Sequence, residues 1–236
     1  MDKPFQPPQA TKLSIVIPAR NEKEGIEGTI RAIPRDKLEK MGYEVEVLVV
    51  DNGSDDGTGE LARRAGAEVV FEPKPGYGSA YKAGFACATG DIIATADADL
   101  TYPVEDIPRL VKILEEEKLD FLTTNRFALM DKDAMSFRNK VGNTILNLSM
   151  RLLFGLDIKD SQSGMWVFRR SILGKLKLTS NTPLSQELKI EACHFAKCHW
   201  KEILIRYQPR TGKAKLGGWK VGITNLLHLF KKRLIR

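Results

Sequence analysis

The sequence predicts an α/β fold in which a mostly parallel sheet is flanked by helices. Short β-rich apolar runs alternate along the chain with segments of helical character. The spacing of these runs is that of βαβ units, which build parallel sheets. The chain has 236 residues, enough for one sizeable α/β domain, and its 42% hydrophobic and 28% charged residues are typical of a globular protein.

The expected elements follow one another at regular intervals. Strands are predicted over Lys12–Pro18, Glu44–Asp51, Ala67–Glu72, Asp91–Ala96, Leu119–Arg126, Ser163–Arg170 and Lys201–Gln208. Helices are predicted over Ala19–Ile33, Gly59–Gly66, Val104–Lys118, Phe137–Phe154 and Leu184–Lys197, and a glycine-rich turn leads into a helix over Lys74–Gly90. Asn21 is a candidate cap for the first helix. No linker divides the chain, so we expect a single domain.

Cysteine usage and hydropathy narrow the class of protein. Three cysteines form no disulfide framework, which favours a reducing compartment. The segment Cys193–His199 contains two cysteines and two histidines, but only His194 and Cys198 share a helical face, so packing is favoured over zinc binding. No apolar run reaches the ~18 residues of a membrane span, and the N-terminus does not have the form of a signal peptide. We expect a protein that is soluble or only peripherally attached to a membrane.

Two carboxylates flank one small residue directly after the apolar run that ends at Ala96. Asp97 and Asp99 lie on either side of Ala98. In an extended backbone the side chains of i and i+2 point to the same side, so these like charges repel each other unless a cation lies between them. A divalent cation is the usual solution, and one held this way usually carries a phosphate group. The sequence therefore predicts a metal–phosphate site here.

Polar residues also follow two other predicted strands. Pro18–Glu22 comes after the first strand and Asp51–Asp56 after the second. In parallel sheets, ligands bind beyond the carboxyl ends of the strands. We expect these two clusters and the paired aspartates to form one site.

Several segments, in this order, resemble the family 2 glycosyltransferases of the GT-A fold, and most closely the synthases that attach sugars to dolichyl and other polyprenyl phosphates. The segments are SIVIPARNE, VVDNGSDDGT, PGYGSAYKAGF, ATGDIIATADADLTYPVEDIP, NRF, DSQSGMWVFRR, QELKIEA and YQPRTGKAKL. The resemblance implies a Rossmann-like GT-A catalytic domain over residues 12–215, between a Pro-rich tail (1–11) and a basic amphipathic helix (216–236). It also implies inverting, metal-dependent transfer of a hexose or N-acetylhexosamine from a UDP- or GDP-sugar.

The resemblance also names the residues of the donor site. The nucleotide sugar would lie against Pro18, Arg20, Glu22, Asp51, Asp97, Ala98 and Asp99. The alternative for Asp51 is that it merely starts a turn with Asn52–Gly53. Mg²⁺ or Mn²⁺ on Asp97 and Asp99 would stabilise the departing diphosphate. Many close members of the family have a Gln where this chain has Thr101, a weaker ligand, so water is the alternative third ligand.

For the acceptor, the resemblance implies a dolichyl or other polyprenyl phosphate, an anion that needs positive charge rather than a base. Arg126 and Arg138 match family arginines that bind this phosphate, and a guanidinium suits bidentate phosphate contact. The alternative for Arg126 is an ion pair with a core acid at the strand end. Arg210, Lys213 and Lys215 match a basic loop that closes over the phosphates, and a solvated loop is the alternative.

Two further acids match family positions. Asp160 would help to position the acceptor or the donor sugar. Glu187 is a general base if the acceptor is a hydroxyl, or a structural partner of a basic residue if the acceptor is a phosphate. We favour the structural role.

The C-terminal region carries the positive charge. Residues 203–236 contain nine basic and no acidic residues, whereas the first 202 hold 28 basic and 30 acidic, a net charge of −2. One helical face collects the apolar side chains of Trp219, Ile223, Leu226, Leu227, Phe230 and Leu234. These features predict a helix at an anionic membrane surface and a cytoplasmic, peripheral enzyme; docking of the helix on the core stays open. Ile145, Leu148 and Leu152 of the predicted helix Phe137–Phe154 are also in line, either in a lipid-facing groove or in the core.

Three other functions are alternatives to sugar transfer onto a lipid phosphate. A family 2 enzyme acting on a glycan or small-molecule hydroxyl would use Glu187 or Asp160 as an essential base. A nucleotidyltransferase would carry a Gly-rich, Lys/Arg-bearing signature that IPARNEKEG does not supply. A non-enzymatic membrane- or nucleic-acid-binding protein would not need three polar clusters at strand ends. We expect no nucleic-acid partner, because the tail lacks the interleaved aromatics of a single-strand surface.

Overall fold

One twisted sheet forms the centre of the molecule. The computed structural model describes residues 11–131, 134–212 and 219–235. Its strands are β1 (Thr11–Ala19), β2 (Tyr43–Asp51), β3 (Glu68–Phe71), β4 (Ile92–Thr95), β5 (Phe121–Met130), β6 (Trp166–Arg169) and β7 (Trp200–Tyr207). They are ordered β3-β2-β1-β4-β6-β5-β7. Neighbours are parallel except where β6 runs antiparallel to both β4 and β5. The predicted mostly parallel sheet is confirmed.

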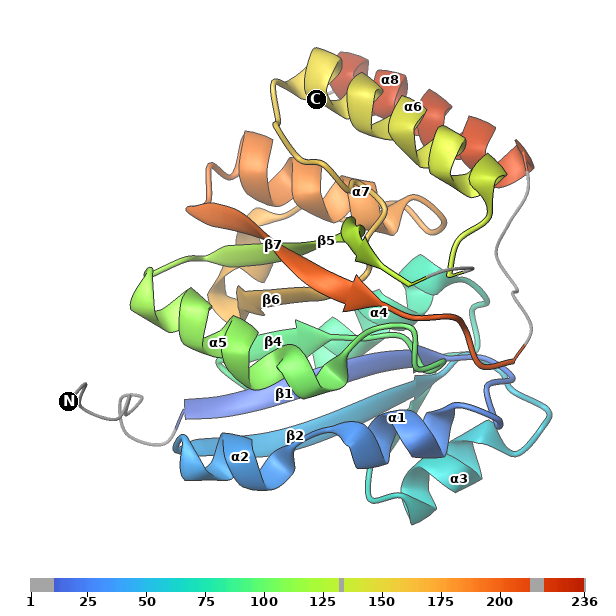
Figure 1. Cartoon of the computed structure of the whole chain (residues 1–236), viewed down its shortest axis with the longest axis vertical. Coiled ribbons are helices and arrows are strands. Elements are labelled where there is room, and N and C mark those ends of the chain that lie inside the picture. The colour runs from blue at the N-terminus through green and yellow to red at the C-terminus, as the bar shows by residue number, and fades with distance from the viewer. Residues whose placement is uncertain (1–10, 132–133, 213–218, 236) are drawn as a thin grey trace.

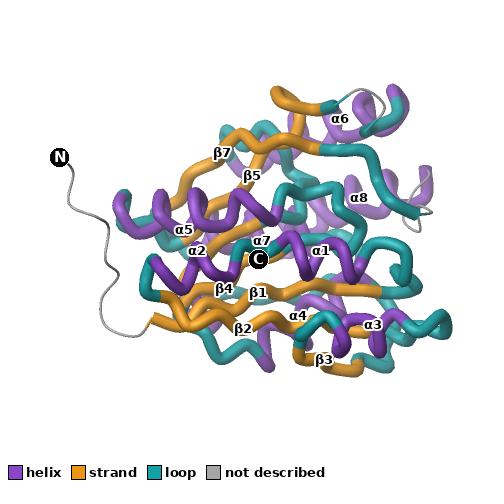
Figure 2. The backbone as a smooth tube through the Cα atoms, turned by 60° about the horizontal axis from the view of Figure 1, so that its bottom comes forward, coloured by secondary structure: helices purple, strands orange, loops and turns teal. Residues whose placement is uncertain are grey.

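Helices cover both faces of this sheet (Figures 1 and 2). One face carries α1 (Ile26–Ala32), α2 (Arg35–Lys40), α3 (Thr58–Arg64) and α5 (Ile107–Glu116). The other carries α4 (Tyr77–Cys87), α6 (Phe137–Phe154), α7 (Leu184–Lys189) and α8 (Trp219–Ile235). Short 3₁₀ segments precede α5 (Val104–Asp106) and follow β6 (Arg170–Lys175). Within the described residues, no helix is both long and apolar enough to cross a membrane.

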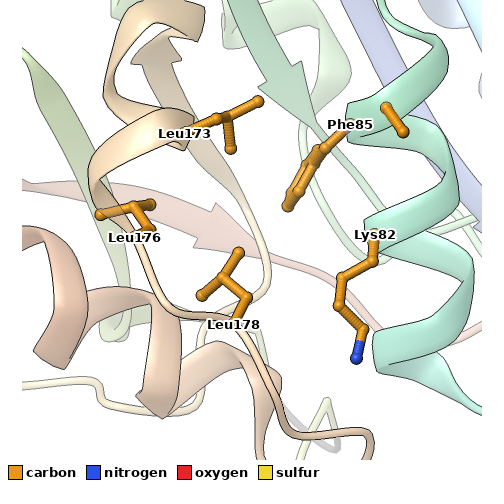
Figure 3. A pocket seen from close by; sticks show the side chains of 6 residues that line it. Lys82, Phe85, Leu173, Leu176 and Leu178 are labelled. Carbon is orange, nitrogen blue, oxygen red and sulfur yellow. The ribbon is translucent and has the colours of Figure 1, made fainter.

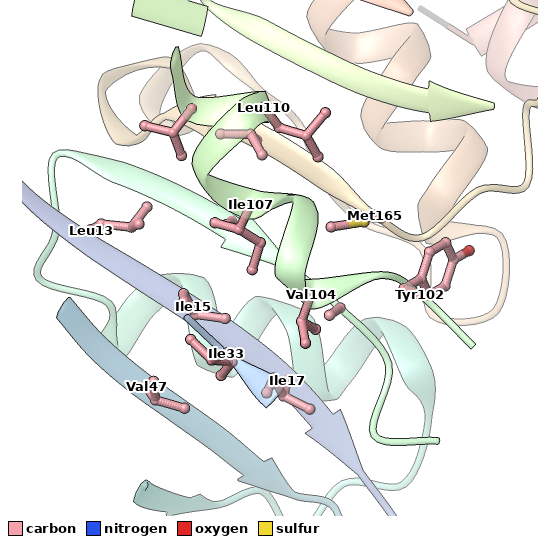
Figure 4. Close-up of a cluster of buried hydrophobic side chains, with 14 of the residues drawn as sticks. Leu13, Ile15, Ile17, Ile33, Val47, Tyr102, Val104, Ile107, Leu110 and Met165 are labelled. Atoms are coloured by element: carbon pink, nitrogen blue, oxygen red, sulfur yellow. The ribbon is translucent and has the colours of Figure 1, made fainter. Parts of the chain in front are cut away.

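Alternation along the strands divides the core into two layers. Leu13, Ile15 and Ile17 of β1 are fully buried against the α5 side, where Figure 4 shows them near Ile107. Val16 points to the opposite layer, as expected for a strand buried on both faces. The strands are therefore held firmly from both sides, which fixes the loops at their carboxyl ends.

Three expectations about the helices differ from the structure. The first helix begins at Ile26 rather than at Ala19, and Asn21 does not cap it. Asn21 instead has a positive φ of 55° and its side-chain oxygen accepts a hydrogen bond from the Asp55 N–H (2.9 Å). Helix α2 was not predicted. The helix expected over Leu184–Lys197 is α-helical only through Lys189 and continues as a π-helical segment over Ile190–Phe195.

The cysteines agree with packing rather than zinc binding. Cys193 and Cys198 are buried and unpaired, and Cys87 is exposed. Burial raises the pKa of the Cys198 thiol, so it carries little thiolate character. The apolar helix over Phe137–Phe154 is present at the predicted bounds as α6. Leu146, Met150 and Phe154 face the core, whereas Ile145, Leu148 and Leu152 are exposed and do not belong to it.

Candidate active site

The first two predicted polar clusters meet at one edge of the sheet. Ala19, the last residue of β1, is in register with Asp51, the last residue of β2. Pro18 is half-buried just before the end of β1, Arg20 is exposed just after it, and Glu22 is partly buried. The expectation that these clusters share one site edge is confirmed by the strand register.

Hydrogen bonds join these two loops. The Asn21 N–H donates to Ser54 Oγ (3.0 Å), and the Glu22 N–H donates to Thr58 Oγ1 (2.8 Å). Asp51 Oδ1 accepts from the Ser54 N–H (2.9 Å), so the turn predicted as its alternative role is present. A Cβ on Gly59 would lie 2.5 Å from Asp51 Oδ2, so only glycine lets α3 pack this closely on the carboxylate. The nucleotide-binding role of Asp51 stays a prediction.

The paired aspartates lie in a turn, not in an extended strand as expected. β4 ends at Thr95, and Leu100 then takes a positive φ of 62°, which costs a branched residue roughly 1–3 kcal/mol. The backbone of Ala98 packs against the loop after β1: a Cβ on Gly25 would lie 2.5 Å from the Ala98 carbonyl oxygen. The two carboxylates are still close enough to interact. Burial, and next the charge of Asp99, raise the pKa of Asp97 to about 7.

Asp99 is held from two sides. Its Oδ1 accepts from the Thr101 N–H (3.1 Å) and hydroxyl (2.6 Å), and its Oδ2 lies 2.7 Å from an Arg210 guanidinium nitrogen. The same guanidinium forms an ion pair with Glu22. The Thr101 hydroxyl thus orients Asp99, which leaves water or a phosphate oxygen as the better source of a third metal ligand.

The acidic cluster suits a metal that arrives with a diphosphate. Glu22 and Asp99 both form ion pairs with Arg210, and the charge of Glu22 also raises the pKa of Asp97, which the charges of Arg210 and Arg126 lower. In the described part of the chain, no three or more His, Cys, Asp or Glu side chains gather as a ready-made metal site. Mg²⁺ is commonly held by one or two carboxylates plus phosphates and water, so the pair Asp97 and Asp99 fits this mode.

Arg126 and Asp160 form a buried bidentate pair next to this cluster. The Arg126 Nε donates to Asp160 Oδ2 (2.7 Å) and a terminal nitrogen donates to Oδ1 (2.9 Å). The guanidinium carbon lies 5.1 Å from the ring centre of Tyr207. The alternative role for Arg126, an ion pair with a core acid at the strand end, is therefore what the structure contains. Asp160 is fully buried, so it acts on a substrate only through the arginine that it orients.

A buried lysine that the sequence analysis did not single out, although it lies in the segment QELKIEA, supports this pair. Lys189 Nζ donates to the carbonyl oxygens of Asp160 (2.6 Å) and Ser163 (3.0 Å). Burial lowers the pKa of Lys189 to about 8, although the charge of Asp160 opposes this change. The lysine therefore fixes the loop that presents Asp160.

Tyrosines form the wall behind Asp97. The Tyr81 hydroxyl lies 3.5 Å from Asp97 Oδ1, and the Tyr102 hydroxyl accepts from the Gly164 N–H (2.7 Å). A Cβ on Gly164 would lie 2.5 Å from the Tyr77 hydroxyl, which explains the glycine in the segment DSQSG. The sequence analysis did not predict these tyrosines as site residues. Their position next to the motifs could have indicated them, because Tyr77 and Tyr81 lie in the glycine-rich segment PGYGSAYKAGF and Tyr102 lies three residues after Asp99.

Glu187 is paired with a basic residue, as its structural role would require. It is fully buried and accepts from the Ser180 N–H (2.8 Å), the Thr179 hydroxyl (3.0 Å) and Lys232 Nζ (2.8 Å). Burial alone would raise the pKa of Glu187, but hydrogen bonds from His228, Lys232 and Ser180 lower it well below its usual range. A carboxylate this strongly stabilised is a poor proton acceptor.

The remaining predicted residues are less informative. Arg138 is exposed in the first turn of α6. Lys213 and Lys215 lie outside the described residues. A shallow pocket of about 380 Å³ between α4 and the segment after β6 is lined by Lys82, Phe85, Ala86, Leu173, Leu176 and Leu178, and contains none of the predicted site residues (Figure 3).

A comparison with models of protein families identifies the family of this chain. The model of "Glycosyl transferase family 2" matches residues 14–177, which is most of the chain. This protein is a family 2 glycosyltransferase. The matched region contains the aspartate pair as well as Arg126 and Asp160, whereas Glu187, Lys189 and Arg210 follow it in the sequence.

Curated relatives of this glycosyltransferase include three with informative names. An uncharacterised glycosyltransferase from Mycobacterium tuberculosis is 37% identical over 212 residues, covering 87% of this chain and 90% of its own. The dolichyl-phosphate hexose transferase of Haloferax volcanii is 30% identical over 226 residues (94% and 96%). The undecaprenyl-phosphate 4-deoxy-4-formamido-L-arabinose transferase of Pseudomonas fluorescens is 31% identical over 219 residues, but these make up only 61% of that longer protein.

Solved structures confirm the GT-A fold of this family 2 glycosyltransferase. Glucosyl-3-phosphoglycerate synthase from Mycobacterium tuberculosis, in complex with Mn²⁺, UDP and phosphoglyceric acid, superposes with a TM-score of 0.74 over 94% of this chain and 78% of its own. The sequence identity is 22%, so this likeness concerns the fold alone. Another structure of the same synthase contains Mg²⁺ and UDP.

Proposed function

We propose that this glycosyltransferase transfers a hexose or N-acetylhexosamine from a UDP- or GDP-sugar to a dolichyl or other polyprenyl phosphate. One observation carries the choice of acceptor: both residues that would serve as the base for a hydroxyl acceptor are buried in ion pairs. Asp160 is bound to Arg126 and Glu187 to Lys232. A phosphate acceptor is already an anion and needs no base. Relatives named for dolichyl-phosphate and undecaprenyl-phosphate transfer support the same choice.

In this proposal, the chain's own residues arrange two anions around one sugar. Asp97 and Asp99 hold Mg²⁺ or Mn²⁺, which when bound neutralises the departing diphosphate. Arg126, oriented by Asp160, supplies positive charge to the acceptor phosphate, and Arg138, exposed in the first turn of α6, is a second candidate for this contact. A single in-line displacement by the phosphate oxygen inverts the anomeric centre. The bond from the anomeric carbon to the donor phosphate oxygen breaks as the bond to the acceptor phosphate oxygen forms, and the nucleoside diphosphate is the leaving group.

A nucleotide-release assay tests the acceptor choice. Purified protein receives UDP- and GDP-sugars with Mg²⁺ or Mn²⁺, with and without a short polyprenyl phosphate in detergent. We expect release that depends on the lipid phosphate and is lost in Asp97→Ala and Asp99→Ala. The charge-balanced double variant Glu187→Gln with Lys232→Met retains turnover if Glu187 is structural, and loses it, despite a native fold, if Glu187 is the base of a hydroxyl-acceptor enzyme.

We also propose that α6 and α8 bind an anionic membrane surface, on which the lipid acceptor resides. The two helices lie side by side in Figure 1. α8 turns its polar contacts inward: Lys232 pairs with Glu187 and Glu191, and Asn225 is buried. Leu229 is buried with them and Leu226 is partly buried, but Ile223, Leu227, Phe230 and Leu234 are exposed, which gives α8 an apolar outer face that an ordinary surface helix does not have. The exposed apolar residues of the pair are Phe137, Val141, Ile145, Leu148, Leu152, Ile223, Leu227, Phe230, Leu234 and Ile235.

Charge favours a membrane over a second copy of the chain as the occupant of this face. Neither helix contains Asp or Glu, and among the side chains that the structure describes the exposed charged ones are Arg138, Lys140, Arg151 (paired with Asp157), Lys231 and Arg233. A symmetric dimer through this face would bring cation against cation, whereas anionic lipids complement it. The cytoplasmic leaflet is the expected location, because nucleotide sugars are the donors.

Vesicle sedimentation tests this surface. We expect binding to phosphatidylcholine vesicles that contain phosphatidylglycerol, weaker binding without it, and loss of binding in Leu227→Glu. The matched control is Phe71→Glu, which changes an equally exposed apolar residue (64% for each) on β3. Equal binding of the two variants, or concentration-dependent dimers in place of vesicle binding, would overturn the proposal.

A further inference from the structure

Arg210 lies where a cation is expected between the acidic side chains. It follows β7, and one terminal nitrogen of its guanidinium contacts Asp99 Oδ2 at 2.7 Å while the other pairs with Glu22. The side chain is 27% exposed, and its buried Nε makes no hydrogen bond. The guanidinium therefore compensates the charges of Glu22 and Asp99, while its Nε–H group has no acceptor.

The oxygen that Arg210 contacts is also the one best placed for a metal. Asp99 Oδ1 already accepts two hydrogen bonds from Thr101, so Oδ2 is the oxygen available for coordination. A guanidinium nitrogen at 2.7 Å and a divalent cation cannot share that position, because both are positively charged and both need direct contact. Metal binding and the ion pair of Arg210 with Asp99 are thus alternatives.

We propose that Arg210 is a built-in competitor of the metal: it occupies the cation position of the free enzyme and leaves it only when a metal arrives together with a diphosphate. The proposal rests on the metal–diphosphate function proposed above for the same site. A metal ion alone would break the ion pair of Arg210 with Asp99 without offering the guanidinium a new anionic partner. A diphosphate offers the displaced guanidinium new anionic partners, including for its unused Nε.

The backbone allows the side chain to move while the segment stays in place. The Gln208 N–H donates to the Thr101 carbonyl oxygen (3.1 Å), and the Thr211 N–H donates to the Asp99 carbonyl oxygen (3.0 Å). These bonds hold the segment 208–211 against the aspartate turn. Rotation of the Arg210 side chain is then sufficient to exchange Asp99 for a phosphate.

The consequence is a coupling between metal and nucleotide. Because the diphosphate relieves the cost of displacing Arg210, each ligand strengthens the binding of the other by the same factor. The arrangement disfavours capture of metal without donor. It also keeps two buried like charges compensated when the site is empty of substrate.

Mn²⁺ binding, followed by electron paramagnetic resonance, tests the proposal without turnover. The wild type is titrated with Mn²⁺ alone and with UDP or GDP present, beside Arg210→Met and the control Arg206→Met, which removes an exposed β7 arginine paired with Asp131. We expect Arg210→Met to bind Mn²⁺ alone roughly tenfold more tightly than the wild type, a size typical of such coupling. The enhancement by nucleotide shrinks by a similar factor. Arg206→Met behaves as the wild type.

Unchanged or weaker Mn²⁺ binding by folded Arg210→Met would overturn the role of Arg210 alone. Absence of Mn²⁺ binding in the wild type, with either nucleotide, would overturn the metal site as well, so the two failures are distinguishable. A second measurement uses the wild type if Arg210→Met does not fold. The Arg210 Nε–H resonance, assigned with Arg210→Lys, must shift on addition of saturating Mg²⁺ with nucleotide; no shift contradicts the exchange of partners.

Discussion

Replacement of Lys232 by methionine tests how α8 is attached. The Lys232 side chain is 9% exposed and its Nζ contacts Glu187 at 2.8 Å, Glu191 at 2.6 Å and the Lys177 carbonyl oxygen at 3.0 Å. Removing one partner of a buried ion pair typically costs about 3–5 kcal/mol, because a buried charge is left uncompensated. Glu187 keeps the Ser180 N–H and Glu191 keeps the Lys177 N–H as donors, so we expect the lower end, about 3 kcal/mol.

Thermal unfolding followed by circular dichroism measures this effect. For a chain of this size, each kcal/mol lowers Tm by roughly 2–4 °C, so Lys232→Met should melt about 6–12 °C below the wild type. Lys231→Met, one residue away and exposed, should stay within about 0.5 kcal/mol of the wild type. Adding Glu187→Gln to Lys232→Met should recover part of the loss, since it removes one stranded charge. If the Lys231 and Lys232 variants have the same Tm, the claim that the ion pairs of Lys232 attach α8 to the core is refuted.

Three further predictions concern the core and the site. Burial alone would raise the pKa of Glu46, but hydrogen bonds from Ser14 and Thr89 and the Lys12 ammonium lower it to about 2, so the stabilisation that this carboxylate contributes is present above pH 4.5 and is lost as the pH falls towards 2. Glu46→Gln should therefore flatten the acid limb of a urea-unfolding series, and an unchanged limb would contradict this. Arg126→Lys cannot reproduce the bidentate contact with Asp160, so kcat/KM for the lipid phosphate should fall at least about tenfold while KM for the nucleotide sugar stays within twofold. Equal losses for both substrates would argue against an acceptor role of Arg126. Gly25→Ala should push the Ala98 backbone away and reduce kcat by about 10²-fold with a small change in Tm. The control is Gly28→Ala, whose Cβ would meet only the flexible Leu100 side chain, and wild-type turnover of Gly25→Ala would show that the aspartate turn tolerates displacement.

The sequence predicted what depends on local pattern. Strand positions followed from apolar runs between turn residues, and parallel pairing from their spacing, so the meeting of Pro18–Glu22 with Asp51–Asp56 was foreseen. The start of the first helix was misjudged because Asn21 makes its hydrogen bond across the site, to a residue 34 positions away, rather than to its own helix. The end of β5 was set four residues early, because its last residues are fixed by pairing with β7 beyond a register shift.

Partners of buried charges were the least predictable feature. Arg126 with Asp160, Glu187 with Lys232, and Arg210 with Asp99 join residues between 34 and 111 positions apart. Nothing in their own segments distinguishes an arginine that binds a substrate from one that binds a core acid. For α8, the apolar stripe was visible in the sequence, but which face of the helix is exposed could not be predicted. That orientation depends on the ion pairs of Lys232 with two buried glutamates.

The most direct test of the central claim compares two acceptors that differ by one group. A donor with a radiolabelled sugar, chosen by the nucleotide-release assay, is offered to a short polyprenyl phosphate and to the corresponding polyprenol, and the organic-extractable label is counted. The account predicts labelled lipid from the phosphate alone, with none in Asp97→Ala, because a phosphate needs no base and both candidate bases, Asp160 and Glu187, are held in ion pairs. Label transferred equally to the polyprenol, or found only in a water-soluble product, would contradict it.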